Sequence, residues 1–493
     1  MPPTAVIPGQ FIAGRWEAGG GAEFASLSPA TGETVWRGRA ADAADVDRAV
    51  LAARAAQPAW EAWPAAERIT RLEAFGRELD ARGQDLAAAI SAETGKPRWE
   101  AKAEVAAMAA KIPITIDAWR RRQAEELTAT DGDVAATRYR AQGVLAMLGP
   151  FNFPGHIPHG QIVPALLAGN AVVFKPSERT PLVGRRMVEL WERAGLPPGV
   201  VNLVPGARET GVALTGHPGL DGILFTGSFE TGVALRRALA DKPGKILALE
   251  MGGNNPLVVH DVSDIEAAVT LTILSAFLSA GQRCTCARRL VVTDWPGRGA
   301  FLDRLASRTR AIRVGVPADE PEPFMGPVID EAAARRLLAA QAELLARGGV
   351  SLVPLRPLGD RPTLLAPGIV DVTAVADRAD AEWFGPLLQV IRVTDFEAAL
   401  AEANRTAYGL VAGLLCDDAD SYDAFRRGVR AGLVNWNQPT TGASSRLPFG
   451  GVGNSGNHRP SGGFAIDACA YPVASLERPA VAPPPTLPPG LDP

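Results

Sequence analysis

Five short apolar segments recur between residues 143 and 256: GVLAMLGP (143–150), NAVVFKP (170–176), VVNLVPG (200–206), GILFTG (222–227) and KILALEMGG (245–253). Segments with helical spacing of apolar residues separate them. Strands that alternate with helices in this way are typical of βαβ units around a parallel sheet. The pattern predicts an α/β fold, and a second α/β run from 257 to about 440 opens with a predicted helix, DIEAAVTLTILSAFLSAG (264–281).

The segments outside these runs have other patterns. Residues 9–38 predict short strands broken by glycine turns, whereas residues 41–125 are alanine-rich and amphipathic and predict helices, with Pro113 at a helix start or a kink. TATDGDVAATRYRAQGV (128–144) predicts a hairpin centred on Asp131-Gly132. The proline-rich tail from residue 479 predicts an extended arm.

Composition excludes several classes of protein. The chain has 493 residues, enough for two or three lobes, and a net charge of −4 with acidic and basic residues mixed along it. This charge argues against a nucleic-acid partner and against a membrane surface. Four cysteines in so long a chain indicate a reducing compartment, and neither a signal peptide nor a long apolar stretch is recognisable. We therefore expect a cytoplasmic protein.

The stretch FLSAGQRCTCARR (277–289) places Cys284 among small and polar residues, where a buried structural cysteine is unusual. Upstream, Glu250 stands in the apolar segment KILALEMGG. A thiol nucleophile and a carboxylate base suit acyl chemistry through a thioester. Asn152, in GPFNFPGHIP (149–158), offers the amide donor that an oxyanion requires, although an asparagine at such a position is more often a turn residue.

Two further motifs indicate a nucleotide. Gly227, Ser228 and Gly232, in FTGSFETG (225–232), would let the backbone approach a phosphate at a helix N-terminus, but the motif alone also fits a plain strand-to-helix turn. Lys175 and Glu178, in FKPSE (174–178), can hydrogen-bond a ribose diol, or they form an exposed surface pair. A carboxylate there would repel a 2′-phosphate, which favours NAD over NADP.

The order of GPFNFP, FKPSE, FTGS, LEMGG and GQRC resembles that of the aldehyde dehydrogenase superfamily, and the resemblance continues through EWFGP (382–386), NWN (435–437) and PFGGVGNSG (448–456). It covers essentially the whole chain. It implies a Rossmann-like NAD-binding domain, an α/β catalytic domain and a small β oligomerisation domain. The implied boundaries are 1–125 and 143–254 for the first, 255–445 for the second, and 126–142 with 467–485 for the third, followed by a tail at 486–493. The resemblance also implies a homodimer or a dimer of dimers.

The resemblance assigns roles to matching positions. Cys284 would be the nucleophile and Glu250 the general base, and Asn152 would share the oxyanion hole with the backbone N–H of Cys284. Lys175 and Glu178 would hold the adenine ribose, Ser228 the pyrophosphate and Glu382 the nicotinamide ribose, with Phe384 beside the ring. The expected NAD-binding set is Lys175, Glu178, Gly206, Gly227, Ser228, Gly232, Glu382 and Phe384. Where the family often has a lysine in the PFGGxKxSG motif, this chain has Gly453.

The strings GHIPHGQIVPALLAGN, LEMGGNNPL, AGQRCTCARRL and SGNHRPSG resemble one group within the family, the N-succinylglutamate 5-semialdehyde dehydrogenases. The implied reaction is the NAD-dependent oxidation of that semialdehyde to N-succinylglutamate in arginine catabolism. Its substrate carries two carboxylates, so fixed cations should line its path. The candidates are Arg283, Arg446, His458 and Arg459, although an ion pair of structural or surface type is an equally good interpretation of each arginine.

Several alternatives remain open. The same chemistry on another ω-semialdehyde, such as glutamate or succinate semialdehyde, is the nearest. A cysteine hydrolase or thioesterase would have no use for FKPSE, FTGS or EWFGP, and a catalytically inactive scaffold would not need Cys284, Glu250 and Asn152. A CoA-acylating dehydrogenase would not need Glu250 as a deacylating base. Cys286 and the five histidines lack metal-ligand spacing, so we expect no metal.

Overall fold

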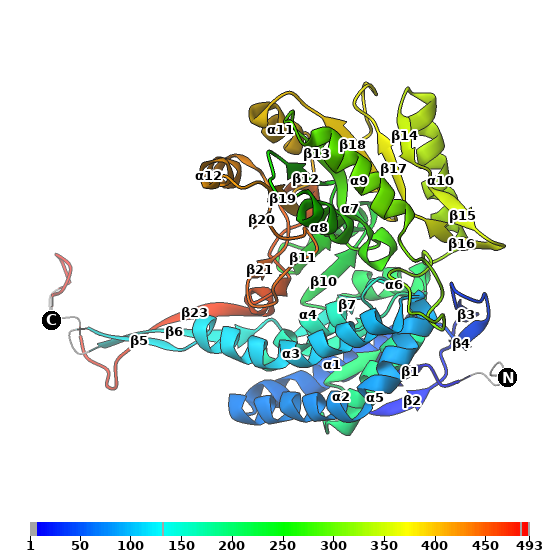
Figure 1. Cartoon of the computed structure of the whole chain (residues 1–493). Helices are drawn as coiled ribbons and strands as arrows, with labels where there is room; N and C mark the ends of the chain where they lie inside the picture. The colour runs from blue at the N-terminus through cyan, green and yellow to red at the C-terminus, as the bar shows by residue number, and fades with distance from the viewer. Residues whose placement is uncertain (1–6, 131–132, 484–485, 492–493) are drawn as a thin grey trace.

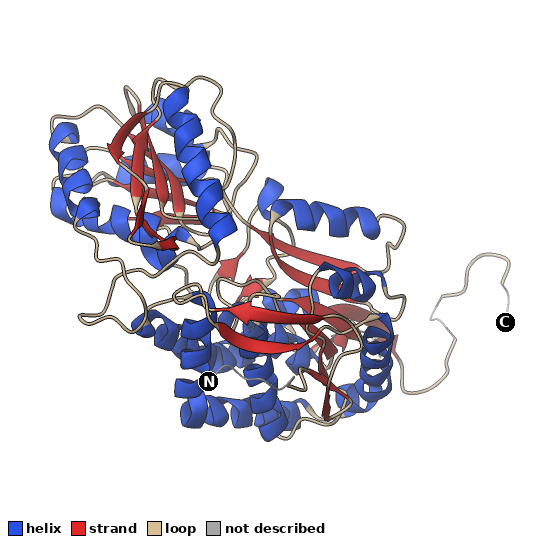
Figure 2. Ribbon diagram, turned by 90° about the vertical axis from the view of Figure 1, so that its right-hand side faces the viewer, coloured by secondary structure: helices blue, strands red, loops and turns tan. Residues whose placement is uncertain are grey.

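The computed structural model describes residues 7–130, 133–483 and 486–491. Figure 1 shows two lobes, one built largely from the N-terminal half of the chain and the other from the segment between about residues 255 and 440, with a long β arm projecting from the first. Figure 2 shows that each lobe has a sheet flanked by helices. No helix in the described residues is both long and apolar enough to cross a membrane.

The first lobe is built on a seven-stranded sheet in the order β11-β10-β7-β8-β9-β1-β2. The strands β7, β8, β9, β10 and β11 lie in the five predicted apolar segments, and they are parallel. Because β8 and β10 flank β7 on opposite sides, the strand order reverses there, and ligands of open α/β sheets bind at such a point. The bounds are β1 (Gln10–Ile12), β2 (Arg15–Glu17), β7 (Val144–Leu148), β8 (Ala171–Lys175), β9 (Val201–Leu203), β10 (Gly222–Gly227) and β11 (Ile246–Met251).

Seven helices accompany this sheet: α1 (Ala43–Ala62), α2 (Ala65–Thr94), α3 (Arg98–Arg122), α4 (His156–Ala168), α5 (Pro181–Arg193), α6 (Arg208–Gly216) and α7 (Phe229–Ala238). Helices α2, α3 and α4 share one core cluster with β7 and β8, which includes Leu72, Met108 and Phe174. The helices expected in residues 41–125 are confirmed. Pro113 lies within α3, which starts after Pro97, so of its two predicted places the helix start is excluded and a position inside the helix remains.

The second lobe holds a sheet in the order β14-β17-β18-β13-β12-β19-β20, parallel except for β14, with a core of its own. Its strands are β12 (Asn255–Val259), β13 (Ala287–Val292), β14 (Val350–Val353), β17 (Gly368–Asp371), β18 (Leu387–Arg392), β19 (Val411–Leu415) and β20 (Leu433–Trp436). Its helices are α8 (Ile265–Phe277), α9 (Arg298–Arg310), α10 (Glu331–Ala346), α11 (Phe396–Ala403) and α12 (Ala419–Gly428).

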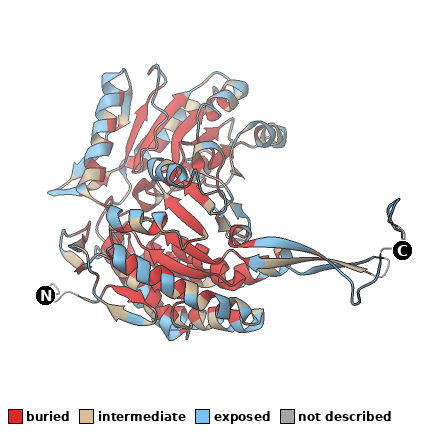
Figure 3. Cartoon of the chain, turned by 180° about the vertical axis from the view of Figure 1, so that it is seen from behind, coloured by how far each residue is buried: buried red, intermediate tan, exposed pale blue. Residues whose placement is uncertain are grey.

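The arm is a three-stranded antiparallel sheet in the order β23-β6-β5, which joins β5 (Glu126–Thr130) and β6 (Asp133–Ala141) to β23 (Ala470–Glu477). The predicted hairpin is therefore confirmed, while its turn residues, Asp131-Gly132, lie outside the described residues. Most of the arm is exposed or half-buried (Figure 3).

Short elements complete the fold. Three two-stranded sheets pair β3 (Glu23–Leu27) with β4 (Thr34–Arg39), β15 (Arg356–Leu358) with β16 (Arg361–Ala366), and β21 (Pro448–Phe449) with β22 (Ser461–Gly462). Three 3₁₀ turns are η1 (Leu278–Gly281), η2 (Gly453–Ser455) and η3 (Ala465–Cys469).

The two large sheets meet end to end. Strand β11 finishes at Met251 and β12 begins at Asn255, so the chain crosses from one lobe to the other within three residues. The neighbour of β12, β13, runs in the same direction and begins at Ala287. The carboxyl end of the first sheet therefore faces the amino end of the second, and Glu250 and Cys284 lie where they meet.

Candidate active site

A left-handed turn delivers Cys284 to the junction of the lobes. After α8, Ser279, Ala280 and Gly281 all have positive φ, at 55°, 52° and 69°. Such a backbone costs roughly 1–2 kcal/mol per non-glycine residue, so neighbouring contacts must hold it. Gly281 is required for a second reason, since a Cβ there would lie 2.1 Å from the carbonyl oxygen of Gly385.

Two residues that the sequence did not single out hold this loop. Asn255 Nδ2 donates to the carbonyl oxygens of Cys284 at 2.7 Å and Cys286 at 2.9 Å. Arg288 is fully buried and donates to the carbonyls of Gly281 at 2.6 Å and Arg283 at 2.8 Å. The available signal for Arg288 was its charge within a strand whose every residue is buried, because a buried guanidinium needs several acceptors.

Glu250, on β11, is buried with 1% of its surface exposed. Burial raises the pKa of its carboxyl to about 7, and the charge of Glu382 adds to the rise, while hydrogen bonding from Cys284 and Thr226 opposes it. Its Oε1 has no hydrogen-bond partner among the described residues. A carboxyl with this pKa is half ionised near neutrality, which suits a general base that activates water.

The glycine-rich loop at 446–463 fixes the backbone around Glu250. Gly456 forms a β-bridge with Glu250, and its neighbour Asn457 exchanges hydrogen bonds with both backbone groups of Leu249, at 2.8 and 3.0 Å. A Cβ on Gly456 would lie 2.0 Å from the Leu249 carbonyl oxygen, so only glycine permits this approach. These backbone contacts of the loop therefore help to fix the position of the Glu250 carboxylate.

The thiol of Cys284 rests in its protonated form. Burial raises its pKa well above the ordinary value, and the charges of Glu250 and Glu382 raise it further. The thiolate is the nucleophile, so the thiol must transfer its proton before attack. Glu250 is near enough to perturb the thiol directly and is itself partly ionised near neutrality.

Asn152 lies in the turn between β7 and α4 and is buried. Its Nδ2 donates one hydrogen bond to the Gln282 carbonyl, at 2.9 Å. An amide nitrogen carries two hydrogens, so a second remains for an oxyanion. The sequence-predicted trio of Cys284, Glu250 and Asn152 thus comes together, with Gln282 linking Asn152 to the cysteine loop.

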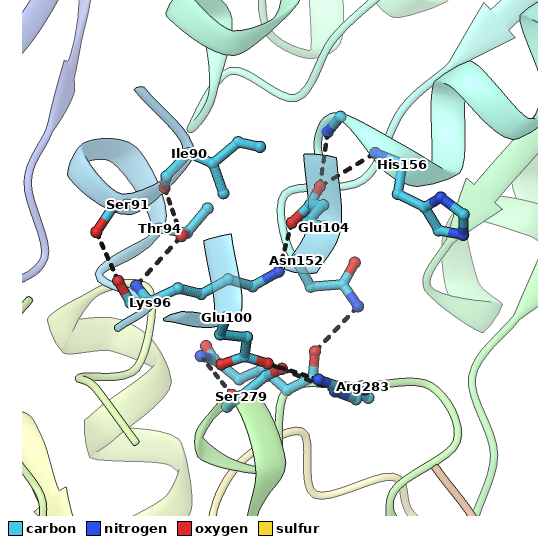
Figure 4. Close-up of polar contacts among 12 residues, drawn as sticks. Ile90, Ser91, Thr94, Lys96, Glu100, Glu104, Asn152, His156, Ser279 and Arg283 are labelled. Atoms are coloured by element: carbon cyan, nitrogen blue, oxygen red, sulfur yellow. Dashed lines mark hydrogen bonds and ion pairs between the residues drawn. The ribbon is translucent and has the colours of Figure 1, made fainter. Parts of the chain in front are cut away.

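Figure 4 shows how residues of α3 hold the left-handed turn before Cys284 and the start of α4. Glu104 pairs with Lys96 at 2.7 Å and accepts the backbone N–H groups of Gly155 and His156, at 2.9 and 3.1 Å. Glu100 accepts from the Ser279 hydroxyl in the left-handed turn. Both glutamates are buried, so their partners in the turn and at the start of α4 are held in fixed positions.

Arg283, a candidate for substrate binding, lies in the same network. Its guanidinium pairs with Glu100 at 2.6 Å and donates to Ser279 at 2.8 Å. It also lies 4.9 Å from the Phe153 ring centroid, and Lys96 Nζ lies 3.4 Å from the same centroid. The ion pair gives Arg283 a structural partner, which is the alternative weighed for it, while part of its side chain stays exposed.

The residues expected at the adenine ribose lie at the carboxyl ends of β8 and β9. Lys175 Nζ donates to the carbonyls of Pro176 and Gly206, both at 2.9 Å, and is buried. Glu178 is exposed, and its charge partly offsets the lowering of the Lys175 pKa by burial. Gly206 has φ of 157°, and a Cβ on it would lie 2.0 Å from Thr210 Oγ1. Lys175 is thus held close to Glu178 and Gly206.

The residues expected at the pyrophosphate follow β10. Ser228 is exposed and caps α7, with its Oγ accepting from the N–H of Thr231 at 3.3 Å. Gly227 ends β10, and Gly232 packs so closely on Met251 that a Cβ would lie 2.2 Å from its sulfur. Backbone N–H groups of an exposed helix start can bind a phosphate.

Glu382 and Phe384 lie beside Arg288. Burial raises the pKa of Glu382 to about 7, and the charge of Arg288, 3.8 Å away, acts against the rise. Glu382 Oε1 is buried without a hydrogen-bond partner among the described residues. The Arg288 guanidinium lies 5.3 Å from the Phe384 ring centroid. Arg288 therefore connects the cysteine loop to both residues expected at the nicotinamide riboside.

The other candidates for substrate carboxylates lie in the glycine-rich loop. Arg446 and His458 are exposed, and Arg459 donates to the Gly451 carbonyl at 3.0 Å. Gly453, where a family lysine is common, has φ of 59°, and a Cβ there would lie 2.4 Å from the Ala407 carbonyl oxygen. The loop conformation thus explains this departure from the family pattern.

Metal ligands were not expected. Within residues 7–130, 133–483 and 486–491, no group of three or more His, Cys, Asp or Glu side chains could hold a metal ion. Cys286 is free and buried, with its thiol directed at the Leu278 carbonyl, 3.7 Å away.

The chain is similar in sequence and in structure to known proteins of one family. Residues 16–472 match the profile described as the Aldehyde dehydrogenase family. A relative from Pseudomonas fluorescens (strain Pf0-1), named N-succinylglutamate 5-semialdehyde dehydrogenase, is 54% identical over 481 residues, 98% of this chain and 99% of the relative. Two solved structures are 29% identical and cover 97% of this chain. One is a candidate methylmalonate-semialdehyde dehydrogenase from Sinorhizobium meliloti 1021 complexed with NAD (TM-score 0.91, 99% of that chain), and the other an NADP-dependent glyceraldehyde-3-phosphate dehydrogenase from Bacillus halodurans C-125 complexed with NADP (TM-score 0.89, 100% of that chain).

Proposed function

Because the chain belongs to the aldehyde dehydrogenase family, we propose that it oxidises N-succinyl-L-glutamate 5-semialdehyde to N-succinyl-L-glutamate with NAD. The observation that carries the chemistry is the meeting of Cys284, Glu250 and Asn152 at the junction of the two sheets. The substrate comes from the name of the full-length relative that is 54% identical.

Acylation begins at Cys284. The thiol gives its proton to the neighbouring Glu250 carboxylate, and the sulfur adds to the aldehyde carbon, which forms a thiohemiacetal and places negative charge on the oxygen. The free hydrogen of the Asn152 amide and the backbone N–H of Cys284 stabilise that oxyanion. Loss of hydride from the same carbon leaves a thioester on Cys284. The carbonyl contacts of Asn255 and Arg288 hold the sulfur in place during both steps.

Deacylation requires Glu250. A carboxylate that is half ionised near neutrality takes a proton from water, and the resulting hydroxide attacks the thioester carbon. The carbon–sulfur bond breaks, the thiol is regenerated and the carboxylic acid leaves. The unpartnered Oε1 of Glu250 is an acceptor for such a water. A CoA-acylating enzyme or a scaffold has no need of this group.

The residues present fit a nicotinamide dinucleotide. Glu382 Oε1 is an unpartnered buried acceptor of the kind that a ribose hydroxyl satisfies, and Ser228 starts a helix whose N-terminus is open to a phosphate. Lys175 and Glu178 suit a ribose diol, and the exposed carboxylate of Glu178 opposes a 2′-phosphate, which favours NAD over NADP. Bound NAD supplies the hydride acceptor.

The test is NADH formation by purified protein with N-succinylglutamate semialdehyde, beside a Cys284→Ala variant. We expect turnover that the variant loses. Turnover of glutamate or succinate semialdehyde with a higher kcat/KM would replace the proposed substrate and keep the mechanism. Ester hydrolysis without any NAD reduction would support a cysteine hydrolase instead.

The β arm is proposed as the contact with a second copy of the chain. Large apolar side chains on it are exposed, including Leu127, Tyr471 and Leu476, the last with 84% of its surface exposed. Strand β5 is also an edge strand, with unpaired backbone groups on one side. A homodimer or dimer of dimers would cover both features, and light scattering of the wild type against a Leu127→Arg, Leu476→Arg variant would show whether assembly depends on the arm.

A further inference from the structure

Lys111 is a buried cation without a counter-ion. It lies on α3, with 2% of its surface exposed, and its Nζ donates to the carbonyl of Gly462 at 2.6 Å. Among the described residues, no carboxylate lies within ion-pair distance of it. Burying a charge is costly unless an opposite charge compensates it, so an unpaired ammonium marks a place where an anion would bind favourably.

His156 supplies a second unsatisfied group close to Lys111. It opens α4, and its Nδ1 is buried without a hydrogen-bond partner among the described residues. Burial lowers the pKa of this imidazole, and the positive charges of Lys111, Lys96 and Arg283 lower it further. Figure 4 shows the His156 ring directed away from the Lys96–Glu104 pair, so the ring is not part of that network.

The charges around His156 do not balance. Glu104 neutralises Lys96 at 2.7 Å, and Glu100 neutralises Arg283 at 2.6 Å. Lys111 is left as the excess cation of the group. Near it on α4, Gly160 has no side chain, and a Cβ there would lie 3.8 Å from Lys111 Cε, so the lysine stem has room on this side.

This region adjoins the reacting centre. His156 lies four residues after Asn152 in the sequence. Lys111 Nζ donates to the carbonyl of Gly462, which lies in the glycine-rich loop whose Gly456 forms a β-bridge with Glu250. Both sides of an anion site between Lys111 and His156 therefore belong to segments that also carry Asn152 or contact the loop beside Glu250.

We propose that Lys111 and His156 bind a carboxylate of the aldehyde substrate and thereby select acidic semialdehydes. The inference rests on the proposed function and deepens it. The ammonium of Lys111 pairs with the carboxylate, and the imidazole of His156 donates a hydrogen bond to it. Both groups act as specificity determinants rather than in the chemical steps, because neither belongs to the trio that reacts.

The test compares an acidic with an uncharged aldehyde. In Lys111→Met, which keeps most of the unbranched side chain and removes its charge, the KM for N-succinylglutamate semialdehyde should rise about 10- to 100-fold, the range of a charge-assisted hydrogen bond. The loss in kcat/KM should be at least about tenfold smaller for an uncharged linear aldehyde, which offers Lys111 no carboxylate. Lys102→Met is the matched control, since Lys102 lies exposed on the same helix. Equal losses on both aldehydes, or no change on either, would overturn the proposal.

A second variant guards against misfolding of the first. His156→Phe should weaken the binding of the product, N-succinylglutamate, about tenfold in calorimetry and leave the uncharged aldehyde unaffected. Normal product binding by this variant would contradict the role of His156. The outcome also separates the two proposals: fast turnover of N-succinylglutamate semialdehyde that is insensitive to Lys111 overturns the binding site alone. Preference for another acidic semialdehyde, with a KM that depends on Lys111, overturns only the proposed substrate.

Discussion

Buried carboxylates lie on both sides of Cys284, and they differ in their partners. On the sheet side, Glu250 and Glu382 each keep a buried oxygen without a hydrogen-bond partner among the described residues, and burial raises both pKa values to about 7. On the helix side, Glu100 and Glu104 form close ion pairs at 2.6 and 2.7 Å, although Glu100 Oε2 is also buried without a hydrogen-bond partner among the described residues. Burial alone therefore does not identify a reacting group.

This difference in partners distinguishes carboxylates that suit a catalytic or binding role from carboxylates that hold the surrounding structure in place. Glu104, which pairs with Lys96, accepts the backbone N–H groups at the start of α4 and so orients that backbone. Glu250 has no ion-pair partner among the described residues and Glu382 has only the more distant Arg288, 3.8 Å away, so each can exchange a proton near neutrality or accept a hydroxyl from a ligand. By the same criterion, the unpaired Lys111 stands apart from the paired Lys96 on the helix side.

The largest effect on activity is expected from a change at Glu250, on the sheet side of Cys284. Glu250→Gln should lower kcat about 10²- to 10⁴-fold, because no base remains to activate water for deacylation. The first turnover should still release NADH in a burst, slower than in the wild type, because acylation precedes the blocked step but Cys284 loses its neighbouring proton acceptor. Rapid-mixing kinetics would measure both, and steady-state turnover close to that of the wild type would show that Glu250 is not the base.

Breaking a pair on the supporting side should act on stability instead. Glu104→Gln leaves Lys96 buried without its counter-charge and should destabilise the fold by about 3 kcal/mol, seen as a lower urea midpoint. Glu67→Gln on the exposed surface of α2 is the control and should leave the midpoint unchanged. An unaltered midpoint for Glu104→Gln would mean that the Lys96–Glu104 ion pair does not contribute to the stability of the fold.

A pH profile sharpens the comparison further. Since the Glu250 pKa is raised to about 7, the carboxylate is lost as pH falls through 7, and the deacylation rate should drop about tenfold per unit below it. The Cys284 thiol also gains reactivity with pH, so single-turnover hydride transfer must be followed separately. Hydrolysis of a preformed thioester that does not vary between pH 5 and 7 would contradict the assignment.

The smallest effect is expected at the exposed Glu178. Glu178→Gln removes the charge that opposes a 2′-phosphate and should raise kcat/KM for NADP several-fold, with that for NAD lowered modestly. Glu209→Gln, at another acidic position in the first turn of α6, is a comparison variant. An unchanged ratio of the two cofactors would place the discrimination elsewhere.

Sequence reasoning was most successful where the signal is local. The parallel strands were predicted from short apolar segments between helices, and the hairpin of β5 and β6 from a turn dipeptide. Cys284 and Glu250 were recognisable because their residue types are unusual in their surroundings. Arg283 shows the limit, because the sequence left a substrate ligand and an ion pair as equally good interpretations, and only the structure identifies Glu100 as an ion-pair partner.

The sequence by itself determined the α/β class, the strand segments and the family motifs, since these depend on periodicity and on residue type within a few positions, and it predicted Cys284, Glu250 and Asn152 as the reacting groups. Only the tertiary structure decided which charges are compensated. Arg283 pairs with Glu100, Lys111 donates to Gly462, and β23 pairs with β6, so each of these contacts joins segments that are distant in the sequence. Such contacts arise when two lobes and an arm pack together, and no local pattern records them.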